Sequence, residues 1–140
     1  MLIFLGGTAA NNDWRTPFTA ALIDAGVHPT AIFNPVVKDW NEAAQAREEA
    51  AKANATIHVY YIADPKQEGN PLSAYSMVEA TMALYDHIDT AVVVFDTTGM
   101  SGHPLKAMDQ TRKVLSKRFP NASILAAPDA GVVARLYQRT

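Results

Sequence analysis

The chain has 140 residues, of which 49% are hydrophobic and 19% are charged, so it can bury one sizeable core but not two. The 12 Lys and Arg against 14 Asp and Glu give a net charge of −2, which excludes the strongly basic surface of a general nucleic-acid binder. The absence of cysteine excludes a disulfide framework, a thiolate nucleophile and a cysteine-ligated zinc site.

The N-terminal apolar run stops at Leu5, which is too short for a signal peptide or a membrane span. We therefore expect a single cytoplasmic domain over residues 1–140. Neither a membrane nor a nucleic-acid partner is expected.

Short β-rich runs alternate with longer segments of helical period along the chain. In chain order, the expected strands are residues 2–5, 31–34, 56–62, 90–95 and 122–126, and the expected helices are residues 14–25, 41–53, 73–87, 105–119 and 130–139. Strict alternation implies right-handed crossovers and a parallel sheet. We therefore expect an α/β fold with a flavodoxin-like, doubly wound, five-stranded parallel sheet in the order 2-1-3-4-5 and helices on both faces.

In such a sheet the ligand site lies beyond the carboxyl ends of the first and third strands. The loops there are residues 6–13 and 63–72, with residues 35–40 and 96–104 beside them. Gly6-Gly7-Thr8 has the position of a phosphate-binding turn, but no third glycine and no Gly-Lys-Ser/Thr follows. A plain chain turn explains the two glycines equally well.

Glu79 is the carboxylate best placed for chemistry, because it lies in the first turns of a helix that starts at this crevice. The helix dipole stabilises an anion there, which suits a nucleophile that must be ionised. Ser76-x-x-Glu79 also matches a capping box, in which Ser76 caps the helix and Glu79 bonds back to it. Both interpretations are open at this point.

Two tryptophans with charged neighbours flank the same crevice. Asp39 and Trp40 end the loop after the second strand, and Trp14 and Arg15 open the first helix. An indole beside a carboxylate can stack on a nucleobase while the acid bonds to the edge of the base. The structural alternatives are that the tryptophans are packing residues and that Asp39 or Asn41 caps the second helix.

Other polar residues point to ordinary structural roles. Histidines 28, 58, 87 and 103 have no i,i+4 partner and no clustered carboxylates, so no metal site is expected, and we expect no cofactor. His58, on a strand, is interpreted as a packed core residue. Glu48 and Lys52 are interpreted as an i,i+4 surface pair.

Five segments together point to a known family: FLGGT at 4–8, NDWR at 12–15, FNPVVKDW at 33–40, YSMVEA at 75–80 and VVVFD at 92–96. The chain resembles the nucleoside 2-deoxyribosyltransferase superfamily, particularly its compact transferase-like branch, from about the first strand through the fourth helix. The resemblance implies a flavodoxin-like fold and a homo-oligomer in which neighbouring subunits complete each other's sites.

The reaction implied by the resemblance exchanges the base of a 2′-deoxynucleoside through a covalent 2-deoxyribosyl-glutamate. By position, Glu79 would be the nucleophile, and Asp39 is the candidate for contacting or protonating the base. The other residues expected to bind the nucleoside or nucleotide are Phe4, Gly6, Gly7, Thr8, Trp14, Arg15, Asn34, Trp40, Tyr75 and Ser76.

The chain departs from well-studied transferases at two places. Their aspartate at the start of the third strand corresponds to Ala55, and an acid shortly before the nucleophile corresponds roughly to Ser73. Three functions therefore stay open: a deoxyribosyl transferase, an N-glycosidase in which water captures the sugar of a deoxynucleoside or deoxynucleotide, and a non-catalytic module that binds a nucleoside or nucleotide.

Overall fold

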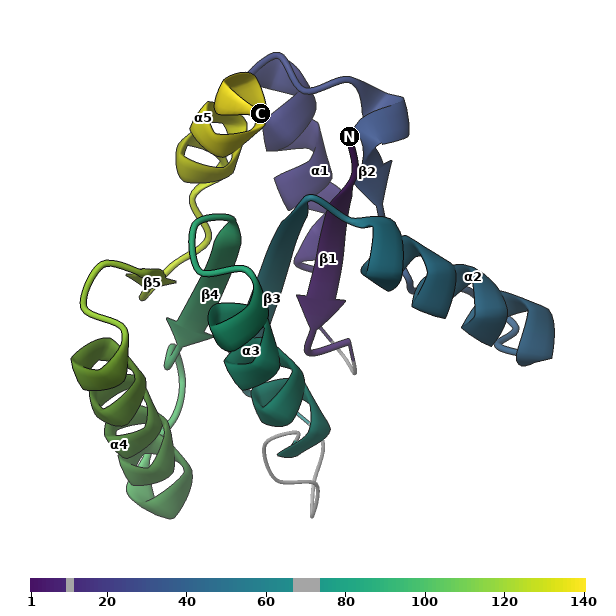
Figure 1. Cartoon of the computed structure of the whole chain (residues 1–140). Coiled ribbons are helices and arrows are strands. Elements are labelled where there is room, and N and C mark those ends of the chain that lie inside the picture. The colour runs from purple at the N-terminus through teal and green to yellow at the C-terminus, as the bar shows by residue number, and fades with distance from the viewer. Residues whose placement is uncertain (10–11, 67–73) are drawn as a thin grey trace.

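The computed structural model describes residues 1–9, 12–66 and 74–140 (Figure 1). Within this part, five parallel strands form one sheet in the order β2-β1-β3-β4-β5. The strands are β1 (Ile3–Gly7), β2 (Ile32–Phe33), β3 (Ile57–Ala63), β4 (Ala91–Asp96) and β5 (Ser123–Leu125). The α/β flavodoxin-like arrangement predicted from the sequence is confirmed.

Five α-helices alternate with the strands in the described part of the chain. They are α1 (Arg15–Asp24), α2 (Glu42–Asn54), α3 (Ala74–Asp86), α4 (Gly102–Arg118) and α5 (Ala130–Arg139). Asn41 caps α2 by accepting a hydrogen bond from the Ala44 amide at 2.8 Å. None of these helices is long and apolar enough to cross a membrane.

Two element boundaries differ visibly from the prediction. β2 has two residues rather than four, because residues Pro29–Ala31 form a short 3₁₀ helix capped by the His28 side chain. α4 begins at Gly102 rather than at Leu105, since Pro104 is tolerated in a first helical turn, where its missing N–H has no intrahelical partner.

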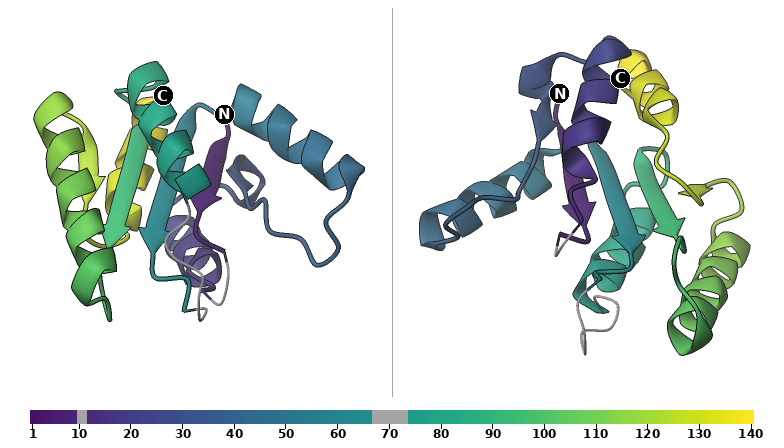
Figure 2. Two further views of the ribbon diagram at one scale, coloured as in Figure 1. Left: turned by 90° about the horizontal axis from the view of Figure 1, so that it is seen from below. Right: turned by 180° about the vertical axis from the view of Figure 1, so that it is seen from behind.

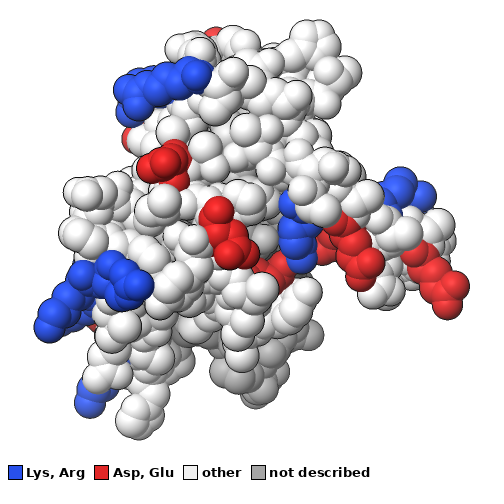
Figure 3. Space-filling view, viewed as in Figure 1, with Lys and Arg blue, Asp and Glu red and all other residues white. Residues whose placement is uncertain are grey.

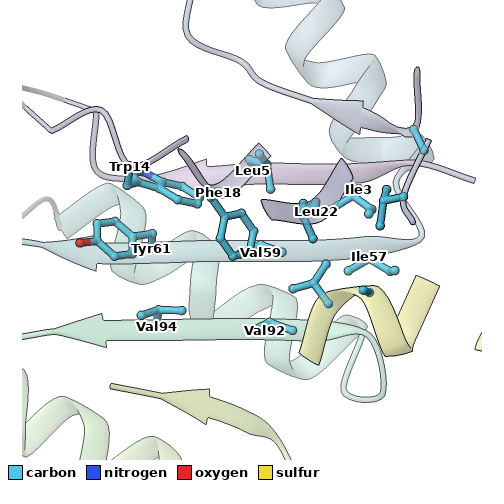
Figure 4. Packing of buried hydrophobic residues seen from close by; sticks show 14 of the residues in the cluster. Ile3, Leu5, Trp14, Phe18, Leu22, Ile57, Val59, Tyr61, Val92 and Val94 are labelled. Atoms are coloured by element: carbon cyan, nitrogen blue, oxygen red, sulfur yellow. The ribbon is translucent and has the colours of Figure 1, made fainter. Parts of the chain in front are cut away.

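The helices cover the sheet in two layers, with α1 and α5 on one face and α2, α3 and α4 on the other (Figures 1 and 2). Large side chains fill the α1 and α5 face. Trp14, Phe18 and Leu22 of this layer are buried against Val59 and Tyr61 of β3 (Figure 4). Successive strand residues point to opposite faces, so the other face receives different residues of the same strands.

The opposite face is covered less completely at its α2 end. Phe4, Tyr60 and Leu84 lie in its buried cluster, whereas the buried residues of α2 itself are Ala44 and Ala51. Alanine leaves little volume between a helix and the sheet, and it gives little apolar burial. Figure 1 shows α2 extending away from the sheet edge beside the short β2.

The sequence suggested that Gly6 and Gly7 form a turn after the first strand. In the structure both glycines lie inside β1. Gly6 pairs with Tyr60 and Gly7 with Tyr61 of β3. A Cβ on Gly6 would lie 2.4 Å from the Tyr60 ring, and one on Gly7 would lie 2.1 Å from the Tyr61 carbonyl oxygen. Gly7 also has a φ of +107°, so the close approach of two strands requires both glycines.

Candidate active site

A cavity of ≈ 320 Å³ opens beside the carboxyl end of β1, within the usual range of small-molecule sites. It lies at the switch point of the sheet, between β1 and β3, where the strand order reverses. The structure brings eight of the predicted site residues to its lining: Phe4, Gly6, Gly7, Arg15, Trp40, Tyr75, Ser76 and Glu79. Glu48, Ala9 and residues 35–37 complete the wall.

Glu79 projects from α3 toward α2, where its Oε2 accepts a hydrogen bond from the Lys52 ammonium in an ion pair. The side chains are 14% and 28% exposed, respectively. Burial lowers the pKa of Lys52, but the hydrogen bond and the charge of Glu79 outweigh burial and raise it above its ordinary value. Lys52 is therefore protonated and positively charged at neutral pH.

The capping-box interpretation of Ser76 and Glu79 does not hold in this structure. Ser76 is inside α3, which the structure describes from Ala74 onward, so it is not a residue that precedes the helix. Glu79 bonds to Lys52 on another helix and lines the cavity. Its carboxylate is therefore available to a ligand.

Aromatic rings form the floor and the rim of the cavity. Phe4 is buried and stacks on Phe33, with ring centroids 5.9 Å apart. Trp40 and Tyr75 are 58% and 68% exposed at the rim. The Lys52 ammonium lies 5.6 Å from the centroid of the Phe4 ring and 5.8 Å from that of Tyr75, so these two rings flank the cation.

Arg15 lies beneath the cavity, where it holds the end of β1. Its guanidinium donates hydrogen bonds to the carbonyl oxygens of Leu5 (2.9 Å), Thr8 (2.9 Å) and Gly7 (3.2 Å). Burial lowers its pKa to about 10, against the opposing charges of Glu48 and Asp13. Arg15 thus fixes the cavity floor through the backbone and also adds positive charge to its wall.

Trp14 and Thr8 lie behind the site, outside the cavity lining. Trp14 is buried on the α1 face, stacks on Tyr61 at 4.8 Å, and donates from Nε1 to the Thr8 carbonyl at 2.9 Å. Thr8 Oγ1 accepts from the Ala63 amide at 3.1 Å and donates to the Ala63 carbonyl at 3.3 Å. Both residues support the pairing of β1 with β3 at the carboxyl ends of these strands.

Asp39 and Asn34, two further predicted residues, are exposed on the segment between β2 and α2. Neither is part of the lining of this cavity. The Asn34 Oδ1 atom accepts a hydrogen bond from the Val36 amide at 3.0 Å and so shapes the loop. Asn41 takes the capping position that the sequence had left open between it and Asp39.

Glu48 and Lys52 are the site residues that sequence reasoning missed, because it paired them with each other on the surface. The structure pairs Lys52 with Glu79 instead and places Glu48 in the cavity wall. The signal was the spacing, because steps of about four residues put Glu48 and Lys52 on the same stripe of α2 as the buried Ala44 and Ala51.

A second cavity of ≈ 380 Å³ lies between α2 and α3 and shares Tyr75 and Glu79 with the first. Its inner wall includes His58, which is buried and whose ring stacks on that of His87 with centroids 4.1 Å apart. Burial and the neighbouring His87 lower the pKa of His58 to about 4, so this histidine is neutral at neutral pH. Its Nε2 donates to the Ala55 carbonyl at 3.2 Å.

Outside the site, basic side chains are concentrated on α4. Basic side chains gather over α4 in Figure 3, where the sequence has Lys106, Arg112, Lys113, Lys117 and Arg118. In residues 1–9, 12–66 and 74–140, no three His, Asp or Glu side chains lie close enough together to hold a metal ion. Ser73 and parts of the loops 6–13 and 63–72 lie outside the described residues.

The family model described as nucleoside 2-deoxyribosyltransferase-like matches residues 1–98 of the 140-residue chain. The chain belongs to this family. No curated protein matches it. The matched part of this nucleoside 2-deoxyribosyltransferase-like protein runs just past β4 and contains every residue that lines the first cavity, whereas α4, β5 and α5 lie beyond the match.

Proposed function

We propose that the protein transfers the 2-deoxyribosyl group of a 2′-deoxynucleoside to another base through a covalent ester on Glu79. The observation that carries the proposal is the placement of Glu79: an accessible carboxylate, paired with a cation, in the wall of a cavity at the switch point of the sheet. Membership of the nucleoside 2-deoxyribosyltransferase-like family supports the same chemistry.

The reaction is a double displacement at the anomeric carbon, C1′. A carboxylate oxygen of Glu79 attacks C1′ while the bond from C1′ to the base nitrogen breaks, and the departing base takes up a proton. A nitrogen of the second base then attacks C1′ from the vacated side, the ester bond breaks, and the carboxylate is restored as that base loses a proton. Two inversions give net retention of configuration.

The cavity wall supplies a role for each part of the nucleoside. Trp40 and Tyr75 offer exposed ring faces at the rim for the base, and the sugar would lie against the backbone of β1 at Gly6 and Gly7, which line the cavity. Asp39 stays our candidate for contacting or protonating the base from the loop beside Trp40. Glu48 is a second candidate for this role, because it lies in the cavity wall.

A homo-oligomer fits the same site. Val36, Val37, Trp40 and Tyr75 are large apolar side chains that line the cavity, and each is more than 40% exposed. A neighbouring subunit that covers this rim would bury the rings and close the site over the substrate, as the family resemblance implies.

Hydrolysis is the second candidate function, with a deoxynucleotide as substrate. Arg15 favours it, because its buried guanidinium lines the cavity and three of its five N–H donors suffice for the three backbone bonds. The remaining donors suit a phosphate. Water would then take the place of the second base.

The test is to incubate the protein with deoxyinosine and adenine and to separate the products by chromatography. We expect deoxyadenosine and hypoxanthine, and we expect Glu79→Gln to lower turnover by at least about 10³-fold, since Gln cannot form the ester. Glu42→Gln, at the exposed start of α2, is the matched control and should leave turnover unchanged. Free deoxyribose would identify a hydrolase.

Two results together would contradict the proposal. Wild-type protein would make no product from any deoxynucleoside or deoxynucleotide, and Glu79→Gln would still bind a nucleoside when measured by calorimetry. That pair of results would identify a non-catalytic binding module.

A further inference from the structure

Lys52 is the cation that contacts Glu79 directly, yet it comes from a different helix and lies 27 residues earlier in the chain. The contact joins α2 to α3 across the boundary of the two cavities, because Glu79 lines both while Lys52 lines the second. α2 otherwise buries only alanines. The ion pair adds a polar contact between two helices whose apolar contact is small.

The geometry of displacement decides on which side of Glu79 the substrate lies. An attacking oxygen, C1′ and the departing base nitrogen must lie nearly in line, so sugar and base occupy the same side of the carboxylate. Glu79 lines the cavity that contains Trp40, Gly6 and Gly7, whereas Lys52 does not line it and binds Oε2 of Glu79 from the second cavity. Lys52 can thus hold Glu79 throughout the reaction without displacing the substrate.

Charge changes on Glu79 in opposite directions in the two half-reactions. Attack on C1′ converts a carboxylate to a neutral ester, so a bound cation stabilises the starting state more than the ester. Breakdown of the ester regenerates the negative charge, so the same cation stabilises the departing carboxylate as its charge develops. A low exposed fraction on both side chains strengthens both effects, because water screens the pair less.

We propose that Lys52 is a positioning residue that drives the second half-reaction, by stabilising Glu79 as the group that leaves C1′ when the acceptor base or water attacks. This inference rests on the function proposed above. The ammonium stays in place after the ester forms because the rings of Phe4 and Tyr75 flank it at 5.6 and 5.8 Å and hold a cation that has lost its counter-ion.

Lys52→Met tests the inference, because it keeps the length and packing of the side chain and removes the charge. At pH 8, where a carboxylate is ionised without help, we expect ester formation at least as fast as in the wild type. We expect ester breakdown to slow by about 100-fold, since removing one group that stabilises charge developing in a transition state costs about 10²–10³-fold. The ester should therefore accumulate.

The measurement is rapid mixing with deoxyinosine, acid quench and intact mass of the protein over time, with adenine then added to follow breakdown. Lys52→Arg restores a cation and should restore most of the breakdown rate. Arg47→Met, on the exposed side of the same helix, is the matched control and should behave as the wild type does.

The outcomes separate this inference from the function on which it rests. If the wild type forms an ester on Glu79 and Lys52→Met breaks it down just as fast, the role of Lys52 is overturned and the function stands. Slower formation with unchanged breakdown also overturns it, because Lys52 then serves only the attack. If the wild type forms no ester with any deoxynucleoside or deoxynucleotide, the proposed function fails and this inference fails with it.

Discussion

Helices α1 and α2 cover opposite faces of the same five-stranded sheet, and they bring different kinds of side chain to it. The face under α1 and α5 receives Trp14, Phe18 and Leu22, all with an exposed fraction of 6% or less. On the other face, α2 contributes two buried alanines and a lysine paired with Glu79. The first face is packed closely (Figure 4), and the second holds the two cavities that share Glu79.

This difference shows how a domain of 140 residues makes room for a ligand without losing its core. Large apolar side chains on the α1 and α5 face, and around α3 and α4 on the other, supply the burial that stabilises the fold. Small side chains on α2 then leave space at the switch point, where the strand ends already converge. The site thus occupies the α2 end of one face, while buried apolar side chains fill the rest of that face and the opposite one.

Leu22→Ala compared with Ala51→Gly tests this division most strongly. Leu22 is fully buried in α1, so its truncation should lower the free energy of unfolding by about 2–5 kcal/mol. Ala51→Gly removes the buried contact of α2 and should cost only about 1 kcal/mol, mainly through helix propensity. Chemical denaturation measures both, and equal losses would show that α2 matters as much for stability as α1 does.

Gly7 lies at the end of β1, and Gly7→Ala should lower the free energy of unfolding by about 2 kcal/mol or more. Its backbone has a φ of +107°, and the new Cβ would meet the Tyr61 carbonyl, so left-handed strain of about 1–2 kcal/mol is joined by a clash. Gly26→Ala is the matched control, because its φ is +98° but a Cβ there would meet nothing within 4 Å. The comparison of the two melting curves isolates the strand contact.

On the open face, His58 should make stability depend on pH. Its pKa is lowered on folding from 6.5 to about 4, by burial and by His87, so the unfolded chain binds the proton first. The contribution of neutral His58 to the free energy of unfolding is fully present above pH 6.5 and is lost as the pH falls toward 4. It amounts to about 1–2 kcal/mol for a group that borders a cavity.

Denaturation of wild type and His58→Gln at pH 7 and at pH 4.5 measures this dependence. Gln keeps a donor for the Ala55 carbonyl but does not titrate, so the variant should lose less stability on acidification than the wild type does. His103→Gln, on the exposed first turn of α4, should lose as much stability between pH 7 and pH 4.5 as the wild type does. A parallel loss in His58→Gln as well would show that another group causes the acid sensitivity.

Local pattern was enough to predict the sheet order and the helix that carries Glu79, because both follow from strict β–α alternation. It was not enough for Lys52, whose partner is determined by how α2 crosses α3. Arg15 and Trp14 were assigned to the site from their position in the chain. Their hydrogen bonds to β1 carbonyls depend on strand geometry that no local pattern contains.

The central claim, that Glu79 carries the sugar between two bases, is tested most directly by finding the bond itself. Wild-type protein mixed with deoxyinosine, quenched in acid and digested should yield one peptide whose mass is increased by a deoxyribosyl group, with fragmentation placing the group on Glu79. Glu79→Gln should yield the unmodified peptide. A deoxyribosyl group on another side chain, or product formation by Glu79→Gln at the wild-type rate, would contradict the account.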